Sequence, residues 1–285
     1  MPHALASVPA LAGAISIFLA AYLLNIFYVT VLYHRGLTHG AVRLRPFTRA
    51  LVVHTGNWVT GLDPKGWSCM HRLHHLYSDT KQDPHSPSHH GLAELMLVQL
   101  KSYNRILARL IHAEPKASAV VADLDFPVSW LNRRRLWLLP YLLHAAIAVG
   151  LGLWGHAWLL GAGYWLGMMS HPVQGWMVNA LAHRYGTRNF ETPDDSRNNA
   201  AVALLVFGEG YQNNHHHRPG AANFAMAAGE LDLGFWLCRA AARLGMLELA
   251  AAPAAAPRAT EPAGTGWRDR REELRASRAA VTEEA

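Results

Sequence analysis

The pattern of apolar and charged positions along the chain predicts membrane-spanning helices. No charged residue occurs from Val8 to Tyr33, and at about 1.5 Å per residue this run can cross a hydrocarbon core of about 30 Å. Two further apolar runs, at 136–154 and 157–182, are separated only by Gly155-His156. A connection this short predicts a hairpin of spans. We therefore expect an all-α integral membrane protein with about three spans, at 8–33, 136–154 and 157–182.

The first apolar run has the features of a membrane span rather than of a signal peptide. A signal peptide has a basic leading segment, a shorter apolar core and a cleavage site of small residues. The leader Met1-Pro2-His3 contains no Lys or Arg, and the run ends in Tyr33-His34-Arg35. We therefore expect residues 8–33 to remain in the protein as a true span.

The distribution of Lys and Arg predicts the orientation of these spans. Basic residues flank them on one side: Arg35, Arg43, Arg45, Lys65, Arg133, Arg134, Arg135, Arg184 and Arg188. Because basic loops stay on the cytoplasmic side, we expect regions 34–135 and 183–249 to be cytoplasmic and the N-terminus to lie outside. The expected location is a bacterial inner membrane.

Residues 1–249 form one predicted membrane domain. The apolar segment 47–62 is short, and a crossing there would put the histidines on its two sides on opposite faces of the membrane. If those histidines share a site, the segment must lie along the interface. Residues 231–249 predict an amphipathic helix, which with the interfacial segment would form a cytoplasmic helical cap. Ala-Pro repeats and mixed charges at 250–285 predict a disordered tail.

Composition narrows the class of protein and of partner. Of the 285 residues, 51% are hydrophobic and 16% are charged, whereas about a quarter are charged in soluble domains. The net charge of +6 could indicate nucleic acid, but the arginines flank apolar runs, which a membrane explains. We therefore expect a lipid bilayer and no nucleic acid as partner. Two cysteines, Cys69 and Cys238, make neither a disulfide framework nor a thiolate zinc site.

Eighteen histidines are the unusual feature of the composition, and several share a spacing. Positions three and four apart fall on one face of a helix, so His71, His74 and His75 would project toward one point. The spacing recurs in Gln212, His215 and His216, with an amide in first place. Two histidines end the first apolar run and one follows Asn179 by a helical turn: His34, His39 and His183. Imidazole is the commonest metal ligand, so these eight histidines predict a metal centre.

Eight histidines exceed what one ion needs. Structural zinc is closed by four ligands that usually include Cys, and a helix-borne zinc protease carries His-Glu-x-x-His, so neither fits. Histidines without a carboxylate between them suit two nearby ions of iron, copper, nickel or zinc. A site at the membrane face implies an acyl or alkyl substrate drawn from lipid. His85 and His171 are candidates for contacts that support the ligands.

Three segments of the chain resemble the histidine boxes of membrane fatty acid desaturases. They are His34-Arg35-Gly36-Leu37-Thr38-His39, His71-Arg72-Leu73-His74-His75 and Gly208-Glu209-Gly210-Tyr211-Gln212-Asn213-Asn214-His215-His216. The acyl-CoA branch (stearoyl-type, delta-nine desaturases) is the most similar, because Val178-Asn179-Ala180-Leu181-Ala182-His183 and Asp83-Pro84-His85 match it too. The resemblance covers nearly everything from about residue 20 to 240.

The resemblance implies a di-iron centre that introduces a double bond into a fatty acyl chain with dioxygen and two electrons. One iron would take His34, His39, His71, His75 and His215. The other would take His74, His183 and His216, with Asn179 holding a bound water. Two iron ions are the implied cofactor, and no catalytic residue is implied beyond the metal centre.

The resemblance also implies how substrate and electrons reach the site. Trp67 and Trp176 are candidates for walls of an acyl tunnel, or else belong to an interfacial tryptophan belt. Arg184, Arg188 and Arg197 could grip the phosphates of an acyl carrier, or else face lipid as cytoplasmic charges. The carrier (CoA, a carrier protein or a phospholipid) stays open. Electrons must come from an external donor, such as ferredoxin or a cytochrome with its reductase, because the sequence carries no flavin or NAD fingerprint.

Two departures from the family pattern keep alternatives open. Gln212 stands where the third box has histidine, so it could bind metal through its oxygen, hold a water or leave a position open. The branch usually has a span ahead of the one that ends in the first box, and none is expected here. A lipid or alkane hydroxylase on the same di-iron scaffold is the first alternative. A metal-binding membrane protein without enzymatic activity is the more remote one.

Overall fold

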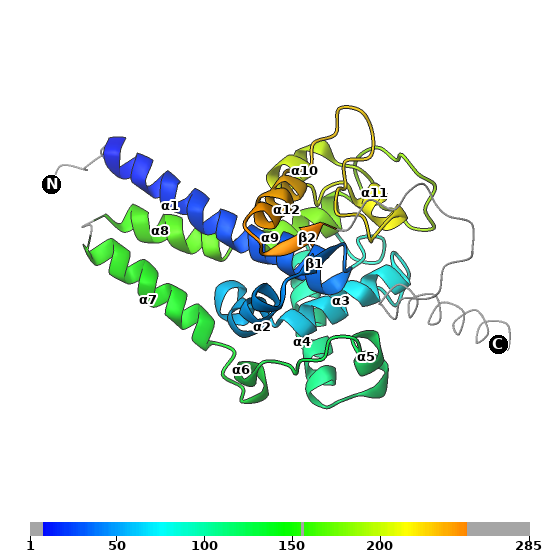
Figure 1. Ribbon diagram of the computed structural model, residues 1–285, viewed down its shortest axis with the longest axis horizontal. Coiled ribbons are helices and arrows are strands. Elements are labelled where there is room, and N and C mark those ends of the chain that lie inside the picture. The colour runs from blue at the N-terminus through cyan, green and yellow to red at the C-terminus, as the bar shows by residue number, and fades with distance from the viewer. Residues whose placement is uncertain (1–7, 155–156, 250–285) are drawn as a thin grey trace.

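Three helices form an arm that extends from a larger, mostly helical body (Figure 1). The structure is a computed structural model that describes residues 8–154 and 157–249. The predicted tail at 250–285 and the turn Gly155-His156 lie outside the described residues. The helices of the arm are α1 (Val8–Ile26), which continues directly into η1 (Phe27–Thr38), α7 (Leu139–Trp154) and α8 (Trp158–Met168).

Glycines allow the helices of the arm to pack closely, with α8 in contact with both α1 and α7. A Cβ atom on Gly161 would lie 2.1 Å from the carbonyl oxygen of Ala148 in α7. One on Gly163 would lie 2.5 Å from the carbonyl oxygen of Ala14 in α1. Small residues at such contacts are typical of helices that pack within a membrane.

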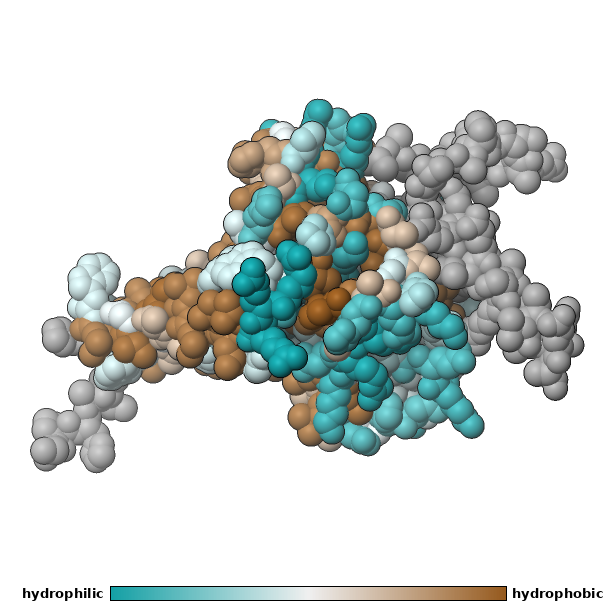
Figure 2. Space-filling model, turned by 90° about the horizontal axis from the view of Figure 1, so that it is seen from below, coloured by the Kyte–Doolittle hydropathy of each residue, from teal (hydrophilic) through white to brown (hydrophobic). Residues whose placement is uncertain are grey.

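The outward faces of the arm are apolar, and polar residues gather on the body (Figure 2). Leu19 of α1, Leu142 of α7 and Leu166 of α8 are each more than half exposed. Among the described residues, one helix is long and apolar enough to cross a bilayer, Pro9–Thr38. The 16 residues of α7 span about 24 Å, which is shorter than a hydrocarbon core of about 30 Å.

The third predicted span, 157–182, contains three helices: α8, α9 (His171–Trp176) and η2 (Met177–Leu181). Pro172 lies in the first turn of α9, where its missing N–H is tolerated, although proline cannot continue a preceding helix. The apolar run therefore contains a break that its composition did not reveal. The number of membrane crossings stays a prediction.

The body consists of shorter helices and one small sheet. Its remaining helices are α2 (Pro46–Thr60), α3 (Pro64–Tyr77), α4 (Leu95–Ile111), α5 (Pro115–Val120), α6 (Trp130–Arg133), α10 (Ala200–Leu205), α11 (Gln212–His217) and α12 (Leu233–Arg243). β1 (Val42–Leu44) pairs antiparallel with β2 (Leu247–Leu249), a small exception to the all-α prediction. The helix predicted over 231–249 ends at Arg243, because Gly245 adopts a left-handed backbone with φ of 71° and the chain turns into β2.

Two buried arginines within the histidine motifs hold the histidine-bearing elements together. Arg35 of η1 forms ion pairs with Glu209 and Asp232, at 2.7 and 3.0 Å. Arg72 of α3 forms an ion pair with Asp123 at 2.6 Å and donates to two carbonyl oxygens at the end of η1. Because a buried charge is stable only when it is paired, these contacts fix how η1, α3 and the segment before α11 lie together.

Candidate metal centre

The first two histidines lie side by side because η1 is a π-helix. The backbone N–H of His39 donates to the carbonyl oxygen of His34, five residues earlier, at 3.1 Å. The wider turn brings the two rings to 4.9 Å between centroids. Such π-helical segments are rare and are often found at functional sites.

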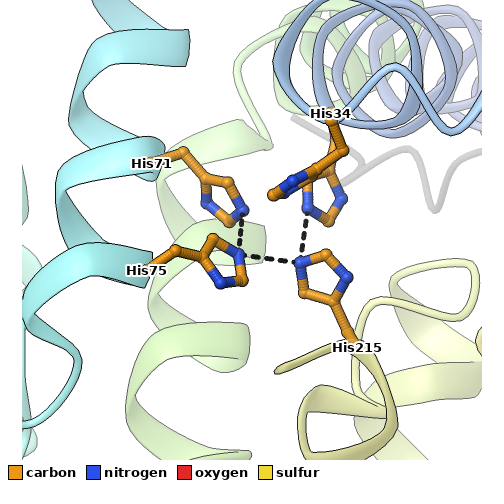
Figure 3. Close-up of side chains that lie close together, drawn as sticks. His34, His71, His75 and His215 are labelled. Carbon is orange, nitrogen blue, oxygen red and sulfur yellow. Dashed lines mark hydrogen bonds between the residues drawn. The ribbon is translucent and has the colours of Figure 1, made fainter. Parts of the chain in front are cut away.

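Five histidines from three elements meet inside the body. This five-histidine group comprises His34 and His39 of η1, His71 and His75 of α3, and His215 of α11. All five are buried, and their candidate ligand nitrogens lie within 4.8 Å of one another. The Nε2 atom of His215 lies 3.0 Å from that of His34 and 2.9 Å from that of His75 (Figure 3).

This spacing fits a shared metal ion. Two nitrogens that bind one ion at about 2.1 Å and at a right angle lie about 3.0 Å apart. His34 directs its Nδ1 atom to Glu209 at 2.7 Å, which leaves Nε2 to face the centre. Burial, and then the neighbouring imidazoles, lower the pKa of His71, His75 and His215 well below the ordinary value. These rings are therefore neutral at pH 7 and offer a lone pair to a metal.

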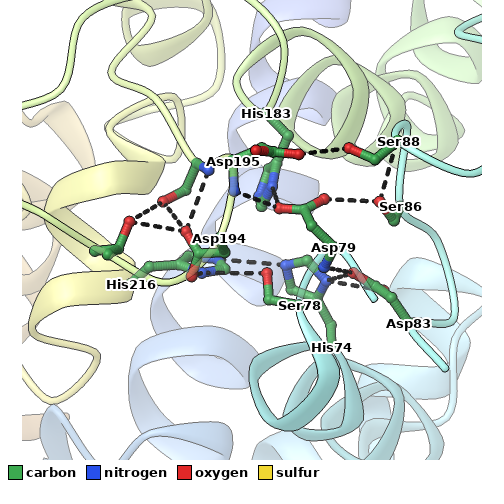
Figure 4. A network of polar contacts seen from close by, with 12 residues as sticks. His74, Ser78, Asp79, Asp83, Ser86, Ser88, His183, Asp194, Asp195 and His216 are labelled. Atoms are coloured by element: carbon green, nitrogen blue, oxygen red, sulfur yellow. Dashed lines mark hydrogen bonds and ion pairs between the residues drawn. The ribbon is translucent and has the colours of Figure 1, made fainter. Parts of the chain in front are cut away.

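A second set, the three-histidine group, comprises His74, His183 and His216 (Figure 4). They come from α3, the turn after η2 and α11. The Nε2 atoms of His74 and His216 are 3.3 Å apart. His183 Nε2 is buried and has no hydrogen-bond partner among the described residues. Because a buried polar atom without a partner costs about 1–3 kcal/mol, this nitrogen indicates that a ligand binds here.

The structure brings together all eight histidines that the sequence singled out, with the division into five and three that the resemblance implied. The expectation that His71, His74 and His75 converge on one point was wrong. Each residue turns a helix by about 100°, so His74 and His75 diverge and serve different groups. His217 is exposed and stacks on Phe190 with ring centroids 3.9 Å apart, outside both groups.

Four carboxylates hold the outer nitrogens of the histidines. They are Glu209 with His34 at 2.7 Å, and Asp83 with His74, Asp79 with His183 and Asp194 with His216, each at 2.9 Å. Every contact is made by Nδ1, so the carboxylate fixes the ring and turns Nε2 toward the centre, as is typical of metal-binding histidines. We did not predict these roles from the sequence. The available signal was that Asp79 and Asp83 closely follow the second histidine motif and that Glu209 lies within the third.

The carboxylates are ionised despite their burial. Burial raises the pKa of Asp83, but the charge and hydrogen bond of His74 more than offset this and lower the pKa below its ordinary value. Histidine partners lower the pKa of Asp79 and Asp194 in the same way against the effect of burial. Burial lowers the pKa of His183, but the hydrogen bond and charge of Asp79 outweigh it and raise the pKa.

Gln212 and Asn179 line one cavity beside the histidines. Gln212 is buried, and its Nε2 atom donates to the carbonyl oxygen of Glu209 at 2.7 Å. Its Oε1 atom has no hydrogen-bond partner among the described residues. Asn179 contacts the side-chain oxygen of Gln99 at 3.5 Å. The amide oxygen of Gln212 is therefore available to a metal or a water.

This cavity is mostly apolar, and histidines of the five-histidine group are among its lining residues. It holds about 850 Å³ of space, part of it open to solvent. Its apolar walls include Ile26, Val29, Leu62, Met70, Leu100 and Val178. Trp67 lines it and stacks on His71, with ring centroids 5.1 Å apart and planes 10° apart; its role as a wall of an acyl tunnel stays a prediction. Its polar lining includes His34, His71 and Gln212.

The other predicted substrate residues are not among the described residues that line the cavity. Trp176 donates its indole N–H to the carbonyl oxygen of Leu92, 2.6 Å away. Arg188 and Arg197 donate to backbone carbonyl oxygens of the surface segment that carries them. Arg184 is exposed. A role for these residues in binding substrate stays a prediction.

Comparison with known sequences points to one family. A sequence model described as fatty acid desaturase matches residues 9–252, which is most of the chain and includes every histidine of both groups.

Individual relatives are similar over most of this chain. It is 27% identical over 81% of its length to an icosanoyl-CoA 5-desaturase of Limnanthes douglasii, and the match covers 63% of that protein. It is 29% identical over 78% of its length to an acyl-CoA C20 Delta5-desaturase of Anemone leveillei, covering 68%. It is 28% identical over 82% of its length to a hex-5-enoyl-(acyl-carrier protein) acetylenase of Moorena producens (strain JHB), covering 75%. The chain thus spans just under two thirds of the first of these relatives.

Proposed function

The chain belongs to the fatty acid desaturase family, and we propose that it introduces a double bond into a fatty acyl chain at a pair of iron ions. The observation that carries this proposal is the mostly apolar cavity that buried histidines of the five-histidine group help to line. A cavity of this kind accepts a methylene chain and directs it to a metal centre. The names of the relatives, which include two acyl-CoA desaturases and an acetylenase, support the same chemistry.

The proposed metal ligands are the two histidine groups. The five-histidine group would hold one ion, and the three-histidine group would hold the other together with Gln212 and a water on Asn179. Neutral imidazoles bring no charge, so the negative charges of Asp79, Asp83 and Asp194 beside the three-histidine group would offset part of the charge of the bound cations. When bound, a pair of iron ions supplies the dioxygen-dependent oxidation of unactivated C–H bonds.

The proposed reaction balances with an external reductant. Two hydrogen atoms leave adjacent methylene carbons and a C=C bond forms. Dioxygen is reduced to two waters with two protons and two electrons, and the electrons come from a donor such as ferredoxin or a cytochrome with its reductase. The cavity walls hold the two methylenes beside the histidines that line the cavity and exclude bulk water.

We further propose that the acyl chain enters from a carrier at the protein surface. The relatives act on CoA-linked, carrier-protein-linked and lipid-linked chains by their names, so all three carriers are candidates here. The exposed side chain of Arg184 is the best placed of the three predicted arginines to contact a phosphate, because Arg188 and Arg197 already donate to backbone oxygens.

The apolar arm supports a membrane location. In the proposed topology α1 with η1, α7, and α8 with the helices after it form three crossings of a single domain, residues 1–249. The N-terminus would lie outside, and the histidines would lie at the cytoplasmic face of a bacterial inner membrane. The arginines that flank the arm on one side are the basis of this orientation.

The test is expression in a desaturase-deficient host with fatty acid profiling under ¹⁸O₂. A new unsaturated acyl chain without ¹⁸O is the expected product, because both oxygen atoms leave as water. The amide of Gln212 at the position of a further histidine keeps a hydroxylase as the alternative, and an ¹⁸O-labelled hydroxyl group in the lipid would establish it. An unchanged profile from protein that holds two irons would refute both activities.

A further inference from the structure

His85 is a buried histidine whose ring lacks a partner. It is 1% exposed, and neither ring nitrogen has a hydrogen-bond partner among the described residues. The ring lines the cavity and stacks on His74, with centroids 4.6 Å and planes 28° apart. Buried ring nitrogens are normally hydrogen-bonded or bound to metal, so His85 requires a partner that the described residues do not provide.

Asp83 holds His85 beside the three-histidine group. It accepts a hydrogen bond from the backbone N–H of His85 at 3.0 Å, and its other oxygen lies 2.9 Å from His74 Nδ1. Candidate ligand atoms of His74, Asp83 and His85 lie within 4.8 Å of one another. Because these donors already occupy the carboxylate, Asp83 positions both histidines and leaves the imidazole of His85 as the uncommitted ligand.

The three-histidine group needs such a ligand more than the five-histidine group does. Gln212 precedes His215 and His216 by three and four residues, so α11 places an amide where a further imidazole would complete the motif. An amide oxygen is a weaker ligand than imidazole for iron. His85 and Gln212 line the same cavity.

We propose that His85 is the fourth nitrogen ligand of the second ion and compensates for the amide at position 212. The inference rests on the proposed di-iron function. His85 shares a candidate group with His74 but not with His183 or His216. To bind the same ion as those two histidines, its ring would have to turn toward them.

The test is a titration of the full-length, chelator-treated protein in detergent with Fe(II), with iron counted per chain by mass spectrometry. The unmodified protein should bind two irons. His85→Ala should bind one iron tightly and hold the second at least about tenfold more weakly, a loss typical of disturbed metal sites. The double variant His85→Ala/Gln212→His should recover the second iron, because α11 then supplies the missing nitrogen.

His171→Ala is the matched control. His171 is buried, lines the same cavity and has an unpartnered Nδ1 among the described residues, but it belongs to neither histidine group. This variant should keep two irons. If His85→Ala does not purify in folded form, the ⁵⁷Fe Mössbauer spectrum of His85→Gln decides. One of the two iron signals should shift, and a spectrum identical to that of the unmodified protein overturns the proposal.

The outcomes separate this inference from the proposed function. Two irons bound to His85→Ala with unchanged affinity would overturn the role of His85, whatever product the enzyme forms. Suppose instead that the unmodified protein binds two irons, that His85→Ala loses one of them, and that the unmodified protein yields no oxidised lipid. This outcome would support His85 as a metal ligand and refute the proposed desaturase activity.

Discussion

The five-histidine group takes its members from η1, α3 and α11, with closest Nε2–Nε2 distances of 2.9–3.0 Å. The three-histidine group takes one member each from α3, the turn after η2 and α11, and its closest Nε2 atoms are 3.3 Å apart. Each histidine of the three-histidine group is held by its own aspartate. An ion in the five-histidine group would thus be held by many nitrogens, whereas an ion in the three-histidine group would be held by few nitrogens whose rings are oriented by aspartates.

This difference suggests that the two ions would differ in how tightly they are bound and in how many coordination positions stay open. An ion with fewer protein ligands keeps open positions for small molecules. Gln212 and His85 are among the side chains of the cavity with polar atoms that have no hydrogen-bond partner among the described residues. We expect the ion of the five-histidine group to be held tightly and that of the three-histidine group to exchange more readily. The variants below test this asymmetry.

The largest effect should come from His215→Ala, because the Nε2 atom of His215 faces both His34 and His75. Iron at the five-histidine group should be lost and the desaturated product should fall below detection. The comparison variant is His217→Ala on the same helix, which is exposed and outside both groups and should keep iron and activity. Normal iron content in His215→Ala would contradict the assignment of the five-histidine group as a metal site.

A smaller effect is expected from Asp194→Asn, which removes the negative charge beside His216 Nδ1. Loss of an outer partner typically costs about 10- to 100-fold in metal affinity or activity. Only the three-histidine group should lose affinity, as measured by competition with a chelator. Glu191→Gln changes an exposed acid of the same segment and should leave affinity unchanged. Equal weakening of both sites in Asp194→Asn would contradict their independence.

Gln212→His should strengthen the weaker site, since imidazole replaces an amide beside it. We expect slower loss of the second iron to a chelator and equal or higher turnover, measured by product formation. This variant makes the two groups more alike. Complete loss of activity would mean that the Gln212 amide has a function in the reaction that histidine cannot replace.

The smallest effect is expected at the cysteines, which belong to neither histidine group. Burial raises the pKa of Cys69 to about 12 and that of Cys238 to about 11, so neither forms a thiolate at pH 7. N-ethylmaleimide should leave the folded protein unlabelled and its iron content unchanged, and should label both thiols after denaturation. Rapid labelling of the native protein would show that the body opens.

The spacing of the histidines along the chain was enough to predict them as candidate ligands. Their carboxylate partners could be identified only from the structure. The intervals within residues 71–75 and 212–216 are those of one helical face, so the motifs were visible in the sequence. Asp79 meets His183 across 104 positions, and no local pattern encodes such a pair. The split of neighbouring histidines between two groups follows from about 100° of rotation per residue, and we could have anticipated it.

The arm was predictable for the same local reason, since uncharged runs of sufficient length favour apolar helices. The π-helix of η1 was not, because an apolar run predicts a helix but does not indicate that the N–H of His39 bonds to the carbonyl oxygen five residues earlier. The strand β2 replaced the end of a predicted helix where Gly245 turns the chain. Sequence patterns thus predicted most helices and the candidate ligands, whereas the contacts between these elements depend on tertiary packing.

The most direct measurement of the central claim is anomalous X-ray diffraction at the iron absorption edge from crystals of the iron-loaded protein. Two separate peaks should be found, one among His34, His39, His71, His75 and His215, and one among His74, His183 and His216. A single peak, or iron outside these histidines, would contradict the account of two metal sites.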